Sequence, residues 1–353
     1  MSYQLTIEPL GRTIEVKEGQ TILDASLRAG LHLPHACCHG VCGTCKVQVM
    51  DGEIGHGEAT IFALMDIERE EQKCLACCAT LLSDVTIDAD IEEDPDALVL
   101  PVQDFEGVVS RITDLTPTIK GVWVRLDNPQ GIVFQAGQYI NLNMPDGQTR
   151  RAFSLANSPS ENGEIELNIR SVPGGKVTGW IHQALKVGDR VDFSGPYGRF
   201  FVRKSAQLPS LFLAGGSGLS SPKSMIADLI AAGSLQPLTL IYGARSRDEL
   251  YYHEEFEKLA ALHPNFTYIA AISGAVEGDG WSGARGFVHE AAKAHFNNDF
   301  RGQKAYLCGP PVMIDACITT LMQGRLFERD IYTERFFSAA DALQVRSPLF
   351  KTI

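Results

Sequence analysis

Three cysteines near the start of the chain have a spacing that can hold a metal cluster. Cys37, Cys42 and Cys45 read C-x4-C-x2-C when the cysteine between the first two is passed over. Together with a distant fourth cysteine, this spacing binds a 2Fe–2S cluster, in which four thiolates converge on two irons. Gly40 and Gly43 let such a loop turn tightly and point N–H groups at the sulfurs. We therefore expect a 2Fe–2S cluster on this loop.

The fourth thiolate can come from a second group of cysteines that begins 29 residues after the loop, namely Cys74, Cys77 and Cys78. The spacing alone leaves all three open. Plant-type ferredoxin domains carry their last cysteine in a Leu-x-Cys context, and Leu75-Ala76-Cys77 is similar to it. The metal ligands that this resemblance implies are Cys37, Cys42, Cys45 and Cys77.

Other uses of the cysteines agree less well with the sequence. Structural zinc normally takes two C-x2-C-like pairs, whereas three cysteines share one loop in this chain. A disulfide framework suits small secreted domains, but seven of the nine cysteines precede residue 79 and the chain starts without a leader-like segment. We expect a cytoplasmic protein, and the lack of an apolar run of about 18 residues predicts no membrane association.

Charge is distributed unevenly along the 353 residues, which suffice for two or three domains. Residues 1–98 contain 18 acidic and 6 basic side chains, so they carry the whole net charge of −12. Such an excess favours solubility, and it can also steer a more basic protein partner to this domain. No basic patch stands out, so nucleic acid is not an expected partner.

The hydrophobic pattern predicts a multidomain α+β and α/β protein. A hairpin over 3–16, a helix that begins at Thr21 and ends at Gly30, and later short strands suit a β-grasp domain over residues 1–95. The stretch 88–101 is acidic and contains two prolines, and we expect a linker over residues 96–101.

Two further domains are expected after the linker. From Phe105 onward short strand candidates alternate with turns, which favours an antiparallel β-barrel over residues 102–205. The apolar strand 211–214 then precedes a glycine-rich turn and a helix that we expect Ser221 to cap. Apolar strands alternate with helices from there on, so residues 206–353 are expected to form a parallel sheet covered by helices.

Four motifs occur in the order found in ferredoxin–NADP reductase-like proteins. They are Arg151-Ala152-Phe153-Ser154, similar to the flavin motif R-x-(Y/F)-S; Gly174-Gly175-Lys176-Val177-Thr178, similar to the loop at the flavin pyrophosphate; Gly195-Pro196-Tyr197-Gly198 at the barrel exit; and Leu307-Cys308-Gly309-Pro310-Pro311, similar to the nicotinamide-side C-G-P-P motif. The resemblance covers residues 100–353, and the ordered set is more specific than any single motif. It implies that the barrel binds FAD and that the parallel-sheet domain binds NAD.

The same resemblance implies roles for the residues of the first motif. Arg151 offers a rigid fork of donors that suits a diphosphate. Ala152 and Phe153 would lie along the flavin, and Ser154 would be a catalytic residue close to flavin N5. An ion pair for Arg151 and a plain edge-strand hydroxyl for Ser154 are the structural alternatives.

Three more residues are implied at the flavin. Gly175 and Thr178, at the start of a helix, would supply N–H groups and a hydroxyl to phosphate. Phe336 belongs to an E-x-F segment near the C-terminus, and the resemblance implies that it covers the flavin face. A helix cap for Thr178 and a core position for Phe336 are the alternatives.

The expected nucleotide site begins at a glycine-rich turn between a strand and a helix. Gly215, Gly216 and Gly218 provide the anion-binding setting of such a turn. The full G-x-G-x-x-G pattern is not met, because Ser221 occupies its last position.

A cysteine ends one of the later strands, at the edge where open α/β sheets bind ligands. The resemblance implies that Cys308 is a catalytic residue near nicotinamide C4, with Gly309 and Pro310 beside the cofactor. A buried small hydrophobic role for Cys308 is the alternative. Arg245 and Arg247 could meet a 2′-phosphate, but acidic neighbours would repel one, and the resemblance favours NADH.

The whole chain resembles the reductase components of multicomponent phenol hydroxylases, which are soluble di-iron monooxygenases of aromatic catabolism. The segments that carry this resemblance are 62–69, 151–157, 214–222, 302–313 and 321–330. Cys38 departs from the pattern, because relatives usually have glycine there. The resemblance implies that electrons pass from NADH through FAD and the 2Fe–2S cluster to a di-iron oxygenase partner. A reductase of a ring-hydroxylating dioxygenase, a stand-alone NADH:acceptor reductase and a zinc-bearing scaffold are the alternatives.

Overall fold

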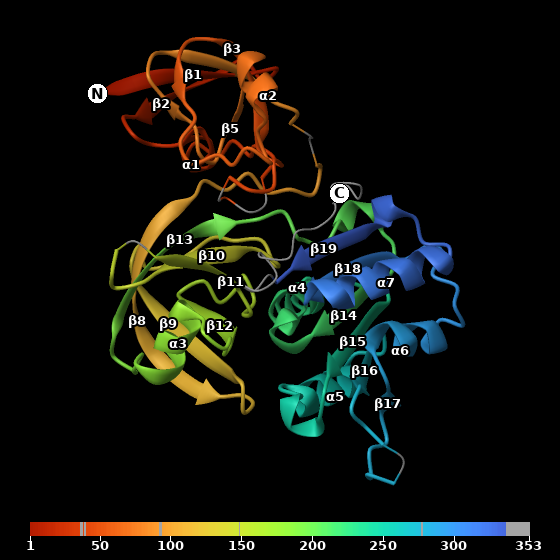
Figure 1. Ribbon diagram of the computed structural model, residues 1–353. Helices are drawn as coiled ribbons and strands as arrows, with labels where there is room; N and C mark the ends of the chain where they lie inside the picture. Colours follow the sequence, from red (N-terminus) through yellow and green to blue (C-terminus); the bar gives the residue numbers. More distant parts are fainter. Residues whose placement is uncertain (36–37, 39, 92–93, 148, 277, 337–353) are drawn as a thin grey trace. The chain divides into compact units, whose positions relative to one another are not determined.

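The computed structural model describes residues 1–35, 38, 40–91, 94–147, 149–276 and 278–336. The chain divides into two compact units, residues 1–103 and residues 104–353 (Figure 1). Cys37, a predicted cluster ligand, and the residues after 336 lie outside the described ranges. The helices of the described ranges are all too short or too polar to span a bilayer.

The first unit has a mixed five-stranded sheet with the order β2-β1-β7-β3-β5. Strand β1 is parallel to β7, and the other neighbours are antiparallel. The elements are β1 (Ser2–Glu8), β2 (Arg12–Lys17), α1 (Ile22–Arg28), β3 (Lys46–Asp51), β4 (Ile54–Gly55), α2 (Asp66–Glu70), β5 (Lys73–Leu75), β6 (Thr80–Leu81) and β7 (Val85–Asp88). Strands β4 and β6 form a separate two-stranded ladder. This is the ferredoxin-like arrangement that the sequence predicts.

Local sequence explains the helix and the first strand of this unit. Thr21 caps α1, because its hydroxyl accepts a hydrogen bond from the N–H of Asp24 at 3.2 Å. The helix buries Ile22 and Leu23. Alternate residues of a strand share a face, and accordingly the first strand buries Leu5 and Ile7.

The second unit begins with a six-stranded antiparallel sheet in the order β11-β10-β13-β8-β9-β12. A bridge between Leu155 and Leu167 connects its two edges, so the sheet forms a nearly closed barrel. The elements are β8 (Gln103–Asp114), β9 (Ile119–Asn128), β10 (Tyr139–Asn143), β11 (Arg150–Ser154), β12 (Glu164–Arg170), α3 (Lys176–Gln183) and β13 (Arg190–Tyr197).

A parallel sheet in the order β17-β16-β15-β14-β18-β19 completes this unit. Its strands are β14 (Ser210–Gly215), β15 (Leu238–Ala244), β16 (Phe266–Ile272), β17 (Ala284–Arg285), β18 (Lys304–Gly309) and β19 (Ile331–Arg335). Its helices are α4 (Ser220–Ala231), α5 (His253–Leu262), α6 (Val288–His295) and α7 (Pro311–Gln323), with short 3-10 turns that include 216–219 and 247–249.

The two faces of the parallel sheet are covered differently (Figure 1). Leu211 and Leu213 of β14 pack in a core with residues of α6 and α7. Phe212 and Ala214, on the opposite face, share a core with α4 and α5 and also with Ile119 and Phe200 from the barrel side. This shared core joins the barrel to the parallel sheet.

Candidate functional site

Strand pairing places two of the predicted cluster ligands side by side. Cys45 directly precedes β3 and Cys77 follows β5, which pairs with β3. The Cys45 carbonyl accepts a hydrogen bond from the N–H of Ala76 at 2.9 Å, and the Cys45 thiol donates to the Cys77 sulfur. Cys42 is close enough to interact electrostatically with both sulfurs. The structure thus brings three of the four predicted ligands together, while Cys37 lies outside the described residues.

The surroundings of these sulfurs fit a 2Fe–2S cluster. Hydrogen bonds from the Cys45 thiol and from the N–H of Gly40 lower the pKa of Cys77 to about 6, although burial opposes them. The thiolate is the form that binds metal. Gly40 has a φ of 70°, and a Cβ there would lie 2.7 Å from the Cys78 sulfur, so the tight turn of the loop needs glycine.

A site that could hold a single metal ion is distinct from a cluster site. Within the described ranges, no group of three or more His, Cys, Asp or Glu side chains is arranged to hold one metal ion. A 2Fe–2S cluster needs no such group, because its four thiolates are shared between two irons.

The other two candidates for the fourth ligand have different surroundings. Cys74 is fully buried in β5, and burial raises its pKa to about 12. Cys78 has its sulfur 3.6 Å from that of Cys77, and burial together with this contact raises its pKa to about 12. Cys77 remains the predicted ligand, and its sulfur's contact with Cys45 and its position near Cys42 support that prediction.

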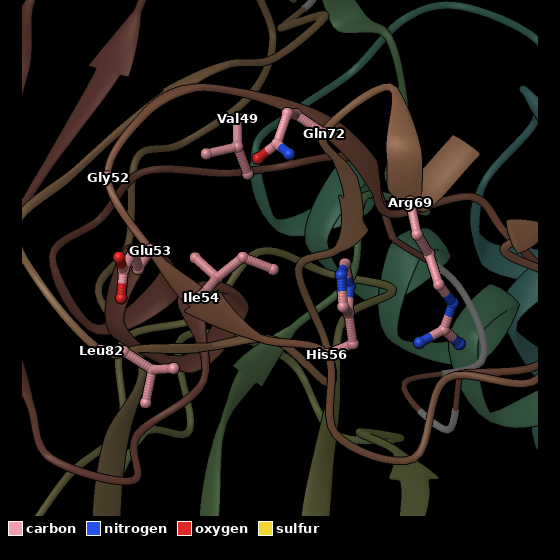
Figure 2. Close-up of a pocket in the computed structure, with 8 residues that line it drawn as sticks. All are labelled: Val49, Gly52, Glu53, Ile54, His56, Arg69, Gln72 and Leu82. Atoms are coloured by element: carbon pink, nitrogen blue, oxygen red, sulfur yellow. The ribbon is translucent and has the colours of Figure 1, made fainter. Parts of the chain in front are cut away.

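A pocket of about 290 Å³ also opens on the first unit (Figure 2). Its lining residues are Val49, Gly52, Glu53, Ile54, His56, Arg69, Gln72 and Leu82. His56 Nδ1 and Arg69 Nε are buried without a hydrogen-bond partner among the described residues, and burial and the nearby guanidinium lower the pKa of His56. No cysteine lines this pocket, so it is separate from the cluster site.

The predicted flavin motif forms β11 at one edge of the barrel sheet. Strand β11 pairs with β10, and Ser154 stands opposite Tyr139. Arg151 and Ala152 are exposed, while Phe153 packs partly against the barrel core. Ser154 is buried and faces β19 of the parallel sheet, where its hydroxyl meets Glu334. The motif therefore reaches from the barrel to the nicotinamide side.

The loop before α3 is built closely around its glycines. Gly175 is the N-cap of α3, and a Cβ there would lie 2.5 Å from Thr178 Oγ1. The Thr178 hydroxyl is not the helix cap, because it accepts a hydrogen bond from the N–H of Val172 at 3.2 Å and so shapes the loop. The binding of phosphate by Gly175 and Thr178 stays a prediction.

One face of β12 carries polar side chains toward the parallel sheet. Glu166, Asn168 and Arg170 alternate with the barrel-core residues of that strand. Asn168 is buried, and neither its Nδ2 nor its Oδ1 has a hydrogen-bond partner in the described part of the chain. Such an orphaned amide fits a site that is completed by a bound cofactor.

A single carboxylate oxygen joins the predicted catalytic residues. Oε2 of Glu334 accepts hydrogen bonds from Ser221 Oγ at 2.5 Å, from Ser154 Oγ at 3.2 Å and from Cys308 Sγ at 3.3 Å. Cys308 is fully buried. Its burial and, to a lesser extent, the charge of the nearby Glu334 raise the pKa of its thiol. The structure thus brings Ser154 and Cys308 to one point, although their sequence positions lie far apart.

The glycines of the predicted nucleotide turn are needed for close packing. A Cβ at Gly218 would lie 2.3 Å from the carbonyl oxygen of Cys308, and one at Gly215 would lie 2.5 Å from Met313 Sδ. Gly216 has a φ of 56°, and a Cβ there would lie 3.2 Å from a guanidinium nitrogen of Arg170. Glycine is therefore required where the turn packs against the end of β18.

Residues at the start of α7 also fit the predicted site. Gly309 ends β18 and Pro310 is the N-cap of α7, so the Cys308 strand leads directly into a helix N-terminus. Phe336 donates its N–H to the Gly309 carbonyl at 3.0 Å and packs partly against the core shared by barrel and sheet. Covering of the flavin by Phe336 stays a prediction.

The structure corrects one local prediction and adds residues to the site. Ser221 does not cap α4, because Leu219 is the N-cap and the 3-10 turn 216–219 runs straight into the helix. The Ser221 hydroxyl binds Glu334 instead. Sequence reasoning gave Glu334 no role, although it lies in the E-x-F segment, because the pairing of β19 with the Cys308 strand is not visible in the sequence.

Comparisons with known proteins agree with this geometry. Residues 5–82 match the 2Fe-2S iron-sulfur cluster binding domain, residues 106–202 the oxidoreductase FAD-binding domain and residues 212–318 the oxidoreductase NAD-binding domain. The fold and these sites define a flavin- and iron–sulfur-dependent oxidoreductase with an NAD-binding domain.

Individual relatives narrow this class. The chain is 61% identical to the reductase component of phenol 2-monooxygenase from Pseudomonas sp. strain CF600, and 59% identical to the phenol hydroxylase P5 protein of Acinetobacter pittii, with all of each chain covered. The crystal structure of Amycolatopsis cytochrome P450 reductase GcoB is similar with a TM-score of 0.85 and 32% identity, covering 95% of this chain and 98% of that one. The chain belongs to the family of reductase components that contains these proteins.

Proposed function

We propose that this protein is the reductase component of a multicomponent phenol hydroxylase and carries electrons from NADH to a di-iron oxygenase. One observation carries the proposal: the same chain holds the converging thiols of Cys42, Cys45 and Cys77 and the buried group of Ser154, Cys308 and Glu334. The full-length similarity to phenol hydroxylase reductases supports the choice of partner.

The two sites suit different electron counts. NADH gives up a hydride, which carries two electrons, whereas a 2Fe–2S cluster accepts one at a time. Bound FAD supplies the chemistry that converts one into the other. The residues of the chain orient the cofactors: Ser154 comes from the barrel, Cys308 is the second-to-last residue of β18, and Glu334 holds both side chains by hydrogen bonds.

The surface of the first unit supports a protein partner for the cluster. Segment 61–67 exposes four large apolar side chains, of which Phe62 is 95% exposed. The same turn contacts the cluster loop, because Thr60 donates its N–H to the Gly40 carbonyl at 3.0 Å. Exposed apolar groups in a unit with a net charge of −12 over residues 1–98 suit a docking surface for a basic, partly apolar face. We infer that this face meets the oxygenase in the cytoplasm, where thiols stay reduced.

Reconstitution tests this function. Purified protein with FAD and cluster is mixed with NADH and either a phenol hydroxylase oxygenase or a ring-hydroxylating dioxygenase. We expect phenol-dependent NADH oxidation and hydroxylated product with the first oxygenase only. Equal or better coupling to the dioxygenase would favour the alternative partner, and a protein without flavin and iron absorption would refute the whole electron path.

A further inference from the structure

The first turn of α4 is attached to the barrel by polar side chains that have no role in the site described above. Lys223 Nζ lies 2.6 Å from Oε2 of Glu166 and donates a second hydrogen bond to the Ala156 carbonyl at 3.1 Å. The next residue, Ser224, donates its hydroxyl to the Asn157 carbonyl at 2.7 Å. Three bonds from two adjacent residues of the helix thus reach β12 and the segment just before it.

A third element joins the same carboxylate. Tyr252 is the residue just before α5, and its hydroxyl donates a hydrogen bond to Oε1 of Glu166 at 2.7 Å. Lys223 Nζ lies 4.6 Å from the centroid of the Tyr252 ring. The Glu166 side chain is only 6% exposed and that of Lys223 20%. We call Glu166, Lys223 and Tyr252 the interface triad, since it connects the barrel to two helices on one face of the parallel sheet.

Stability alone does not account for such a triad. A buried ion pair loses much hydration, and apolar residues of similar size often stabilise a protein as well or better. The triad does, however, define one arrangement, because a carboxylate with both oxygens bound leaves little freedom to the elements that bind it. Apolar packing between barrel and sheet, as around Ile119 and Phe200, is less directional.

The position of Lys223 along α4 connects the triad to the reaction site. Ser221, two residues earlier on the same turn, donates to Glu334, and Glu334 also binds Ser154 of the barrel and Cys308 of the sheet. A shift of α4 against the barrel would therefore move the nicotinamide side relative to the flavin side. Misplacement of reacting groups by about 1 Å can reduce a rate on the order of a hundredfold.

We propose that Lys223 is a positioning residue for hydride transfer: through Glu166 and Tyr252 it sets the distance between the barrel and the parallel sheet. This inference rests on the proposed function only as far as NADH-dependent flavin reduction. It makes no use of the oxygenase, so the two proposals can fail separately.

The test compares five variants of the full-length protein with FAD and cluster bound, namely Lys223→Met, Lys223→Arg, Lys204→Met, Glu166→Gln, and Glu166→Gln combined with Lys223→Met. Lys223→Met removes the charge and keeps the length, and Lys223→Arg restores a donor. Lys204→Met is the matched control. Lys204 also makes an ion pair with α4, to Asp228 at 2.7 Å, but this pair lies at the surface. Flavin bleaching by NADH is followed in single turnovers. Affinity for the nucleotide is measured separately, by titrating the oxidised protein with an NADH analogue that cannot transfer a hydride.

We expect Lys223→Met to slow bleaching by about tenfold to a hundredfold while affinity for the analogue changes by less than about threefold. Lys223→Arg should recover most of the rate, and Lys204→Met should match the parent protein. Glu166→Gln combined with Lys223→Met should lose little more than either single variant, because both act on one contact. Unchanged bleaching in Lys223→Met, or a rate loss matched by an equal loss of affinity, would overturn the proposal. FAD content and melting temperature show whether each variant is folded.

Discussion

Glu334 is the residue on which the two halves of the second unit meet. Three donors from three different segments share its Oε2 atom, namely Ser154, Ser221 and Cys308. Burial raises the pKa of Glu334, whereas these three donors oppose the rise because they favour the charged form. Burial is the largest of these effects, so the pKa of Glu334 is raised on balance.

The raised pKa leads to a prediction about stability and pH. A carboxyl group with a higher pKa in the folded state than in the unfolded chain binds its proton more firmly when folded. Stability is therefore lost as the pH rises from about 4.5 toward the folded pKa, by about 1.4 kcal/mol for each unit by which the two pKa values differ. The Glu334→Gln variant has no ionisable group at this position. The melting temperature of the variant minus that of the parent should therefore be larger at pH 8 than at pH 5. Parallel curves for the two proteins would contradict this.

A second prediction concerns Cys77. Its thiolate is the predicted fourth ligand of the cluster, so its loss should remove the cluster. We expect Cys77→Ala to lose iron and cluster absorption but to keep FAD and NADH-dependent ferricyanide reduction, which needs only the second unit.

Neighbouring cysteines provide the controls for that experiment. Cys78→Ala changes a thiol only 3.6 Å away, and Cys74→Ala changes a core residue. Both should keep two irons per chain, although Cys74→Ala should lower stability by about 1 kcal/mol because it removes buried volume. Retention of two irons in Cys77→Ala would show that another residue is the ligand.

Secondary structure with a strong local signal was predictable from the sequence. The Thr21 cap and the alternation of Leu5 and Ile7 predicted α1 and β1, and the short strands from Phe105 onward predicted the barrel. The start of α4 was misplaced at Ser221, because the glycine-rich turn continues into the helix without a side-chain cap.

Contacts between distant segments were not predictable from one sequence. Glu334 reaches Ser154 and Cys308 only because β19 pairs in parallel with β18 and the barrel edge lies beside them. Lys223 lies on helix α4 and Glu166 on strand β12, 57 positions apart, so no periodicity in the sequence links them. Family resemblance predicted catalytic roles for Ser154 and Cys308, but their common partner Glu334 could be seen only in the three-dimensional structure.

The glycine-rich turn gives a prediction for the elements around it. A Cβ at Gly218 would lie 2.3 Å from the Cys308 carbonyl oxygen and 2.7 Å from Gly309 Cα, so backbone must move. Gly218→Ala should lower the stability of the second unit by about 1–3 kcal/mol and reduce NADH-dependent flavin reduction. Gly179→Ala in α3 is the matched control, since its Cβ would have nothing within 4 Å and alanine favours helices. Equal behaviour of the two variants would show that the turn adapts to a side chain.

Charge and chemistry are divided between the two units of the molecule. The thiols of the cluster lie in the first unit, and the residues of the flavin and nucleotide sites lie in the second. Residues 1–98 carry a net charge of −12 while the rest of the chain is neutral. The acidic first unit, which gives up electrons, favours a basic partner, whereas the neutral second unit, which receives them from NADH, does not.

This division predicts different salt dependence for two assays of the same protein. Ions screen attraction between exposed charges, with a Debye length of about 10 Å at 0.1 M and about 3 Å at 1 M. Coupled turnover with the oxygenase should therefore weaken as salt rises, whereas ferricyanide reduction at the second unit should change little. Asp66→Asn with Glu70→Gln removes two exposed charges on α2, which overlaps the end of the apolar segment 61–67. This double variant should reduce both the coupled rate and its salt dependence. The control is Glu15→Gln with Glu18→Gln, which removes the same amount of exposed charge. These residues lie at and just after β2, at the sheet edge opposite β5, the strand that α2 contacts. This control should leave the coupled rate and its salt dependence nearly unchanged. If the two double variants respond alike, or both assays weaken equally with salt, the partner does not dock on the α2 side of the first unit.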